Sequence, residues 1–258
     1  MKYAIIFDMD ETLGFFQQIN YLWHSLKKIN YNYYGSTLNN NYFSKILDLY
    51  PEFIRPNLVL ILNYLKNKKI ENKCSSVIIF TNNQTSKEWV TLIQNYFNEK
   101  IDYNLFDKII CAYKINEKII EENRNHESKT FDDFIQCTRL DPRTNLLFLD
   151  DKYYPKMNKN NLMYIKIRQF TYTFEKDILL NRLINSDIVK NNLIQKNIVI
   201  NFINNYNYRN KYINEDINIH KILSKKILQH LNKFFSHYKT LKMKIYNKNT
   251  RKNNKSVY

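Results

Sequence analysis

Glycine and proline are scarce, since the 258 residues include only two glycines and four prolines. Asparagine is abundant instead, and we expect it to occupy many of the turns and helix ends where glycine is common in other proteins. Hydrophobic residues make up 44% of the chain and aromatic residues 15%, which excludes a disordered chain and favours a packed globule. The length suits one α/β domain with a sizeable core plus an extension.

Cysteine pairs are also lacking, because Cys74, Cys111 and Cys137 form no CxxC motif. This pattern excludes a disulfide framework and a zinc site, and it predicts buried thiols in a reducing compartment, cytoplasmic or nuclear. No run of about 20 apolar residues is present, so we expect no transmembrane segment. The chain opens on an apolar run without a basic segment before it, so we expect no secretory signal either.

Acidic residues are absent from residues 217–258, where eleven Lys and Arg residues gather. The net charge is +16, so the remainder of the chain carries only +5. Such a basic segment favours acidic partners, for example nucleic acid, a phosphoprotein or a membrane surface. Within it, apolar residues recur at three- and four-residue steps over 221–243. We favour the interpretation that this stripe docks on the rest of the chain and leaves the lysines in water.

Short apolar runs alternate with helical patterns over the first two thirds of the chain. Five buried strands are predicted, at residues 3–7, 76–81, 107–113, 145–150 and 162–167. Helices are predicted at 16–29, 57–67 (with Asn57 as a possible cap), 85–98 and 130–138. Residues 31–41 are typical of a polar turn or hairpin, and residues 117–128 of a solvated charged run. The alternation implies an α/β fold with a Rossmann-like parallel sheet and right-handed crossovers.

Three regions follow from these patterns. Residues 1–176 are predicted to form the α/β domain, with a small aromatic-rich insert at roughly 14–56 after the first strand. Residues 177–245 switch to helical patterns and predict a helical, basic extension. Residues 246–258 are polar and basic, and they are predicted to be a disordered tail.

Acidic residues follow two of the predicted strands. Asp8 and Asp10 come directly after the first strand, and Asp150 and Asp151 end the fourth. The carboxyl ends of parallel strands lie at one edge of a sheet, where ligands bind in open α/β folds. Carboxylates there can hold a divalent cation and supply both a nucleophile and a proton donor. Thr81 ends the second strand at the same edge.

A lysine is the remaining piece of this predicted site. The best candidate is Lys129, directly before the predicted helix at 130–138, and the alternative is Lys114, after the third strand. In chain order these pieces resemble the motifs of the haloacid dehalogenase-like (HAD) hydrolase superfamily. The segments DMDETL (8–13), FIRPNLVLILNYL (53–65) and IIFTNN (78–83) most resemble its FCP/SCP (NLI-interacting-factor) CTD-phosphatase-like branch. The sequence departs from that branch at residues 82–84 and 88–90 and in the aromatic insert.

The resemblance implies a Mg²⁺-dependent phosphatase that acts through an aspartyl-phosphate intermediate. It implies that Asp8 is the nucleophile, that Asp10 is the general acid/base, and that Lys129 neutralises the acids and binds phosphate. The implied metal ligands are Asp8, the backbone carbonyl of Asp10, and one or both of Asp150 and Asp151. The implied phosphate-binding groups are Thr81, Asn82 and the backbone after Asp8, at Met9.

The insert at 14–56 is too short for a large cap, so the resemblance implies a lightly covered site. Such a site would admit a phosphoprotein or another macromolecular phosphate. The alternatives are a nucleic-acid 3′-end phosphatase, or a HAD-fold nucleic-acid-binding or scaffold protein that uses residues 217–258. The five histidines show no metal-like spacing, and we interpret them as solvated or incidental: His24, His126, His220, His230 and His237.

Overall fold

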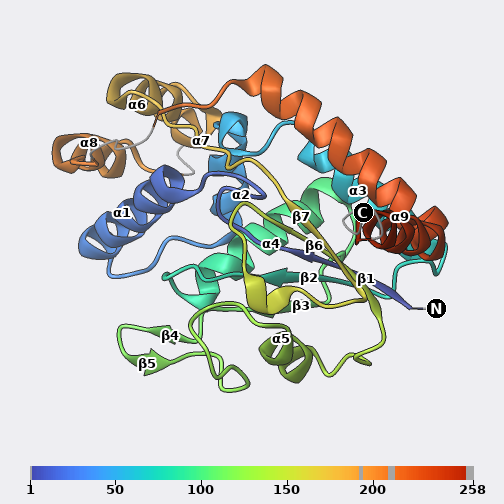
Figure 1. The fold of residues 1–258 in the computed structure, drawn as a ribbon. Helices are drawn as coiled ribbons and strands as arrows, with labels where there is room; N and C mark the ends of the chain where they lie inside the picture. The colour runs from blue at the N-terminus through green and yellow to red at the C-terminus, as the bar shows by residue number, and fades with distance from the viewer. Residues whose placement is uncertain (1, 192–193, 209–212, 254–258) are drawn as a thin grey trace.

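The computed structural model describes residues 2–191, 194–208 and 213–253, with residues 237–253 described by their backbone alone. Five parallel strands form one sheet in the order β3-β2-β1-β6-β7, which confirms the predicted α/β class (Figure 1). The strands of this sheet are β1 (Tyr3–Phe7), β2 (Ser76–Phe80), β3 (Lys108–Ile110), β6 (Asn145–Asp150) and β7 (Leu162–Lys166). A separate antiparallel pair consists of β4 (Lys114–Ile115) and β5 (Lys118–Ile119).

Helices lie on both faces of the sheet, and a further group of helices lies beside it (Figure 1). The helices are α1 (Gln17–Tyr34), α2 (Asn41–Asp48), α3 (Leu58–Ile70), α4 (Lys87–Ile101), α5 (Phe131–Thr138), α6 (Lys176–Ile184), α7 (Asp187–Lys190), α8 (Lys196–Asn205) and α9 (Ile217–Asn253). Short 3₁₀ turns lie at η1 (Pro51–Phe53) and η2 (Pro155–Met157). In Figure 1, α5 lies on one side of the sheet, and α3, α4 and α9 lie on the other.

The core is divided in two by the sheet, because successive side chains of a strand point to opposite faces. Ile5 and Phe7 of β1 belong to the larger apolar cluster, whereas Ala4 and Ile6 belong to the smaller one beneath α5. All four side chains are at most 2% exposed. The continuous apolar run of β1 is therefore what a strand buried on both faces requires.

The order in which strands are added to the sheet switches sides between β1 and β6. From β1 the connection leads to β2 on one side, whereas β6 continues to β7 on the other. At such a switch point the loops after neighbouring strands separate and leave a crevice at their carboxyl ends. Asp8 follows β1 and Asp150 ends β6, so the topology brings both acids to this position.

Four local predictions need correction. Residues 31–41 form no hairpin, because α1 continues to Tyr34 and ends at Gly35, which adopts a left-handed φ of 66°. Tyr33 and Tyr34, at the end of α1, form hydrogen bonds with Asn201 of α8 and with Gln195 next to α8. These tertiary contacts are not evident from local sequence pattern.

The other three corrections are local. Asn57 makes no capping bond. The third strand ends at Ile110 rather than at residue 113, because the Cys111 carbonyl accepts a bond from the Arg124 side chain. The charged run at 117–128 includes Arg124, which is 1% exposed.

Helix α9 packs on the sheet domain through the predicted apolar stripe. Phe234 lies edge-on to Tyr3 of β1 with ring centres 5.3 Å apart, and Ile227 and Leu231 are buried. Residues on both sides of position 176 contribute to the larger core cluster, and the division into domains there stays a prediction. The α9 backbone is helical to Asn253, within the segment for which the sequence predicts disorder, and residues 254–258 lie outside the described residues.

The three cysteines are buried as free thiols, as predicted. Over the described residues, no helix combines the length and apolar character needed to cross a membrane.

A matched pair of substitutions on α9 tests its packing. Leu231→Ala should lower the free energy of unfolding by about 2–5 kcal/mol, because Leu231 is 0% exposed and its loss leaves a cavity. Ile222→Ala should change it by less than about 0.5 kcal/mol, because Ile222 is 56% exposed. Urea denaturation of both variants measures the difference, and equal effects would contradict the docked helix.

Candidate functional site

The backbone of the sheet fixes two acids at the switch point. The Asp8 amide donates to the Leu149 carbonyl at 2.9 Å, which extends the pairing of β1 with β6 by one residue. The Asp150 carbonyl accepts from the Ile167 amide at 3.0 Å, which ties β6 to the chain after β7. Asp8 is 8% exposed and Asp150 is 1% exposed, so both carboxyl groups are largely removed from water.

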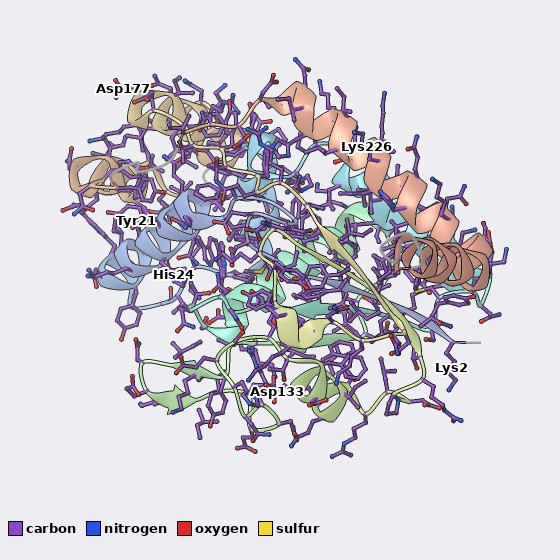
Figure 2. The ribbon with its side chains drawn as sticks, viewed as in Figure 1. Lys2, Tyr21, His24, Asp133, Asp177 and Lys226 are labelled. Atoms are coloured by element: carbon purple, nitrogen blue, oxygen red, sulfur yellow. The ribbon has the colours of Figure 1, made fainter. Side chains whose placement is uncertain are left out.

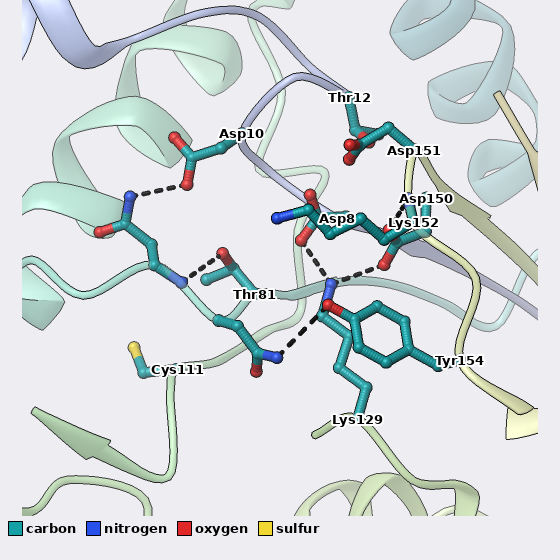
Figure 3. A network of polar contacts seen from close by, with 12 residues as sticks. Asp8, Asp10, Thr12, Thr81, Cys111, Lys129, Asp150, Asp151, Lys152 and Tyr154 are labelled. Atoms are coloured by element: carbon teal, nitrogen blue, oxygen red, sulfur yellow. Dashed lines mark hydrogen bonds and ion pairs between the residues drawn. The ribbon is translucent and has the colours of Figure 1, made fainter. Parts of the chain in front are cut away.

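Lys129 lies between these two acids (Figure 3). Its ammonium group donates to Asp8 and, at 2.7 Å, to Asp150, and its side chain is 1% exposed. Burial alone would lower the pKa of Lys129, but the two carboxylates outweigh burial and raise it. The ammonium group also lies 5.2 Å from the ring centre of Tyr154. The structure therefore places Lys129 among the acids, whereas Lys114 lies on β4 against the Tyr113 ring.

The cap of α5 holds Lys129 in position. Thr130, the next residue, accepts a bond from the Asp133 amide at 3.1 Å and begins the helix, as expected of a threonine with an extended backbone. Lys129 thus enters the site from the position directly before the capping residue of a helix.

Asp151 completes a group of three acids. One oxygen from each of Asp8, Asp150 and Asp151 lies within 4.8 Å of the others. Burial raises the pKa of Asp151, with Asp8 adding to the effect, and burial raises the pKa of Asp150 to about 7. Closely spaced hard oxygens of this kind fit a divalent cation such as Mg²⁺. The Asp10 side chain lies outside this group, and a ligand from its backbone carbonyl stays a prediction.

Asp10 points away from Asp8 and toward the loop after β2 (Figure 3). Its carboxyl group accepts a bond from the Asn83 side chain at 2.6 Å. Burial raises the pKa of Asp10 to about 7, and the nearby Asp8 carboxylate adds to the rise. A carboxyl group with this pKa can carry a proton near neutral pH, which is what a general acid requires.

The loop that carries Asp8 and Asp10 is tightly turned. The Leu13 amide donates to the Met9 carbonyl at 2.8 Å, and Glu11 adopts a left-handed φ of 56°. Position 14, which follows, requires glycine, because a Cβ there would lie 2.5 Å from the Phe53 carbonyl oxygen. The Met9 side chain is buried in the core, and the use of its backbone for phosphate stays a prediction.

The end of β2 contributes Thr81 and Asn82. Thr81 is 1% exposed, and its hydroxyl oxygen accepts from the Asn83 amide at 3.0 Å, which leaves its own proton to donate. The side-chain oxygen of Asn82 accepts a hydrogen bond from Arg124 at 2.9 Å. Strands β1 and β2 are neighbours, with Phe7 opposite Ile79, so Thr81 and Asp8 lie at the same edge of the sheet (Figure 3).

Arg124 is a site residue that the sequence did not indicate. Its guanidinium donates to the carbonyls of Cys111 at 2.7 Å and Glu127 at 3.0 Å, and it lies over the Phe80 ring at 4.9 Å. It therefore joins the ends of β2 and β3 to the loop that leads to Lys129. No sequence signal could have found it, because most of its partners are backbone carbonyls, which every residue has.

Arg55 holds the loop after β1 in the same way. It donates to the carbonyl of Thr12, to that of Glu11 at 2.6 Å, and to Nδ1 of His220 at 2.8 Å. The Arg-Pro pair of the segment 53–65 was its sequence signal. His220, at the start of α9, is 0% exposed, so the interpretation of this histidine as solvated or incidental is wrong. Its ring joins α9 to the acid-bearing loop.

No family model, curated protein or solved structure matches this chain.

The His220 contact predicts a specific acid sensitivity. Burial and then the Arg55 charge lower the pKa of His220 to about 4, below its ordinary value of 6.5, while Glu215 opposes this shift. As the pH falls, His220 of the unfolded state therefore binds a proton before His220 of the folded state does. The wild type should lose up to about 3 kcal/mol of stability between pH 6.5 and pH 4.

The measurement compares urea denaturation of wild type and His220→Gln across that range of pH. The variant should lose less stability than the wild type. His230→Gln, at an exposed position of α9, should retain most of the wild-type dependence. Parallel curves for wild type and His220→Gln would show that His220 is not buried in its neutral form.

Proposed function

We propose that this chain is a Mg²⁺-dependent phosphomonoesterase of the HAD type, with Asp8 as the nucleophile. The observation that carries the proposal is the buried cluster of Asp8, Lys129, Asp150 and Asp151 at the switch point of a parallel sheet. Three carboxylates and one ammonium leave two negative charges in excess. A divalent cation would balance them, and a phosphate dianion could then bind to that cation and to Lys129.

Magnesium held by Asp8, Asp150 and Asp151 would supply the positive charge that a phosphate ester needs before an anion can approach it. Lys129 would supply a second positive charge to the phosphoryl oxygens. The Thr81 hydroxyl, the Asn82 side chain and the backbone at Met9 would orient the same oxygens. Stabilisation of the charge spread over the transferring phosphoryl group is the main contribution of such sites.

The first step is an attack by the Asp8 carboxylate on phosphorus. A bond forms between Asp8 and phosphorus, and the bond from phosphorus to the leaving oxygen breaks. Asp10 gives its proton to that oxygen, so an alcohol and an aspartyl-phosphate result. In the second step Asp10, now ionised, takes a proton from water as the water attacks phosphorus. Inorganic phosphate leaves and the Asp8 carboxylate is regenerated. The raised pKa of Asp10 supports this assignment.

Removal of the nucleophile tests the reaction directly. Asp8→Asn should lower the Mg²⁺-dependent release of phosphate from a panel of phosphate monoesters by at least about 10³-fold, because the amide is a poor nucleophile. Asp177→Asn, which removes an exposed acid from α6, should keep wild-type turnover. Circular dichroism controls for folding. The absence of turnover in the wild type, or equal turnover in Asp8→Asn, would contradict the proposal.

Binding of the cation is expected to stabilise the fold. Millimolar Mg²⁺ should raise the wild-type midpoint of thermal unfolding by a few degrees, because a ligand of the folded state shifts the equilibrium toward it. Asp151→Asn should reduce this shift, since Asp151 is one of the three clustered acids. Asp177→Asn should show the wild-type shift. A shift of the same size in all three proteins would indicate that Mg²⁺ binds elsewhere.

A further inference from the structure

A pocket of about 460 Å³ lies directly beside Asp10. Residues of the loop after β1, α1, the loop after β2, α4 and the segment after α8 line it: Asp10, Phe16, Gln17, Asn20, Tyr21, His24, Ser25, Lys28, Asn83, Thr85, Trp89 and Tyr208. Figure 2 labels two of these residues, Tyr21 and His24, on α1. The volume is within the range of small-molecule sites in proteins.

We propose that this pocket binds a planar aromatic ring on the leaving group of the phosphate ester. The inference rests on the proposed function, in which Asp10 protonates the leaving oxygen. Asp10 lines the pocket and turns away from the Asp8–Lys129–Asp150 cluster, which would hold the phosphoryl group (Figure 3). The leaving oxygen must face Asp10, so the atoms attached to that oxygen extend toward the pocket.

The walls of the pocket favour a flat ring. Four aromatic side chains line it, and two of them, Phe16 and Trp89, are each 1% exposed and fixed by packing. The Trp89 ring lies 5.3 Å from that of Phe43, and the Phe16 ring 6.4 Å from that of Phe97. The other two, Tyr21 and Tyr208, are partly exposed and offer the surface on which a planar ring can stack.

The charges at the pocket favour a neutral or anionic ring. Asp10 is the only acid among its lining residues in the described part of the chain, and its carboxyl group already accepts a bond from the Asn83 side chain. Lys28 supplies a positive charge. The pair Lys27–Glu88, at 2.9 Å, joins α1 to α4 next to the pocket and fixes the distance between its two helical walls. The ring can belong to a phenol, as in phosphotyrosine, or to the base of a nucleotide.

The test compares two substrates that differ in planarity and share a primary alkyl leaving oxygen: benzyl phosphate and cyclohexylmethyl phosphate. Wild-type kcat/KM should be at least about 10-fold higher for benzyl phosphate. Ser25→Phe, which fills the pocket, and Tyr21→Ala, which removes one wall, should each lower kcat/KM for benzyl phosphate several-fold and leave ethyl phosphate unchanged. Tyr31→Ala is the matched control, because Tyr31 lies on the same helix and is 57% exposed.

Phosphotyrosine and nucleoside monophosphates, assayed on the same proteins, identify the source of the ring. Hydrolysis that depends on Asp8, with equal rates for the benzyl and cyclohexylmethyl esters, would overturn the inference and leave the proposed function standing. If no ester is hydrolysed, the binding of benzylphosphonate decides, and it is measured by the change in the intrinsic fluorescence of Trp23 and Trp89. Binding that is weakened by Ser25→Phe and not by Tyr31→Ala would support the pocket without the reaction. Failure to bind, or equal binding by all variants, would overturn it.

Discussion

The ion pairs of Lys129 with Asp8 and Asp150 are the interaction on which the rest of the site depends. The order of the strands brings three acids to one edge of the sheet, and two of them are almost completely buried. Buried charges are stable only when they are paired, and the loss of one partner leaves the others uncompensated. The loop before α5 must therefore reach the edge of the sheet, and the Thr130 cap and Arg124 fix it there. The position of α5 and the geometry of the acids are thus two consequences of the same pairing.

Two buried arginines support this arrangement without neutralising it. Arg55 and Arg124 direct their donors mainly to backbone carbonyls, and each lies against an aromatic ring. A guanidinium paired with one of the site acids would occupy oxygens that the proposed cation would use. With carbonyls as partners, each arginine instead fixes the path of a loop, and Arg55 also joins that loop to His220 of α9. The helix at the C-terminal end of the described chain is thereby connected to the start of the site, 165 residues earlier in sequence.

The sequence predicted those features that local pattern encodes. Buried strands are visible as apolar runs, and acids directly after such runs must lie at the edge of the sheet, so Asp8 and Asp150 could be placed. Lys129 could be preferred because it precedes a helix. The bond of Asp10 to Asn83, the two buried arginines and the burial of His220 could not be found, since each depends on which loops meet in space. The length of α1 was underestimated for the same reason, because its last turn is held by residues in and next to α8.

Asp8 and Asp10 are two residues apart, yet the fold gives them different surroundings. Asp8 continues the line of β1 and accepts a bond from the Lys129 ammonium group. Asp10 lies past the turn at Met9, receives one neutral amide donor and adjoins an aromatic pocket, and burial raises its pKa to about 7. In the proposed reaction, these surroundings suit Asp8 to attack and Asp10 to hold a proton. Because Asp10 lines the pocket, the turn between the two acids would then set the direction in which the leaving group departs.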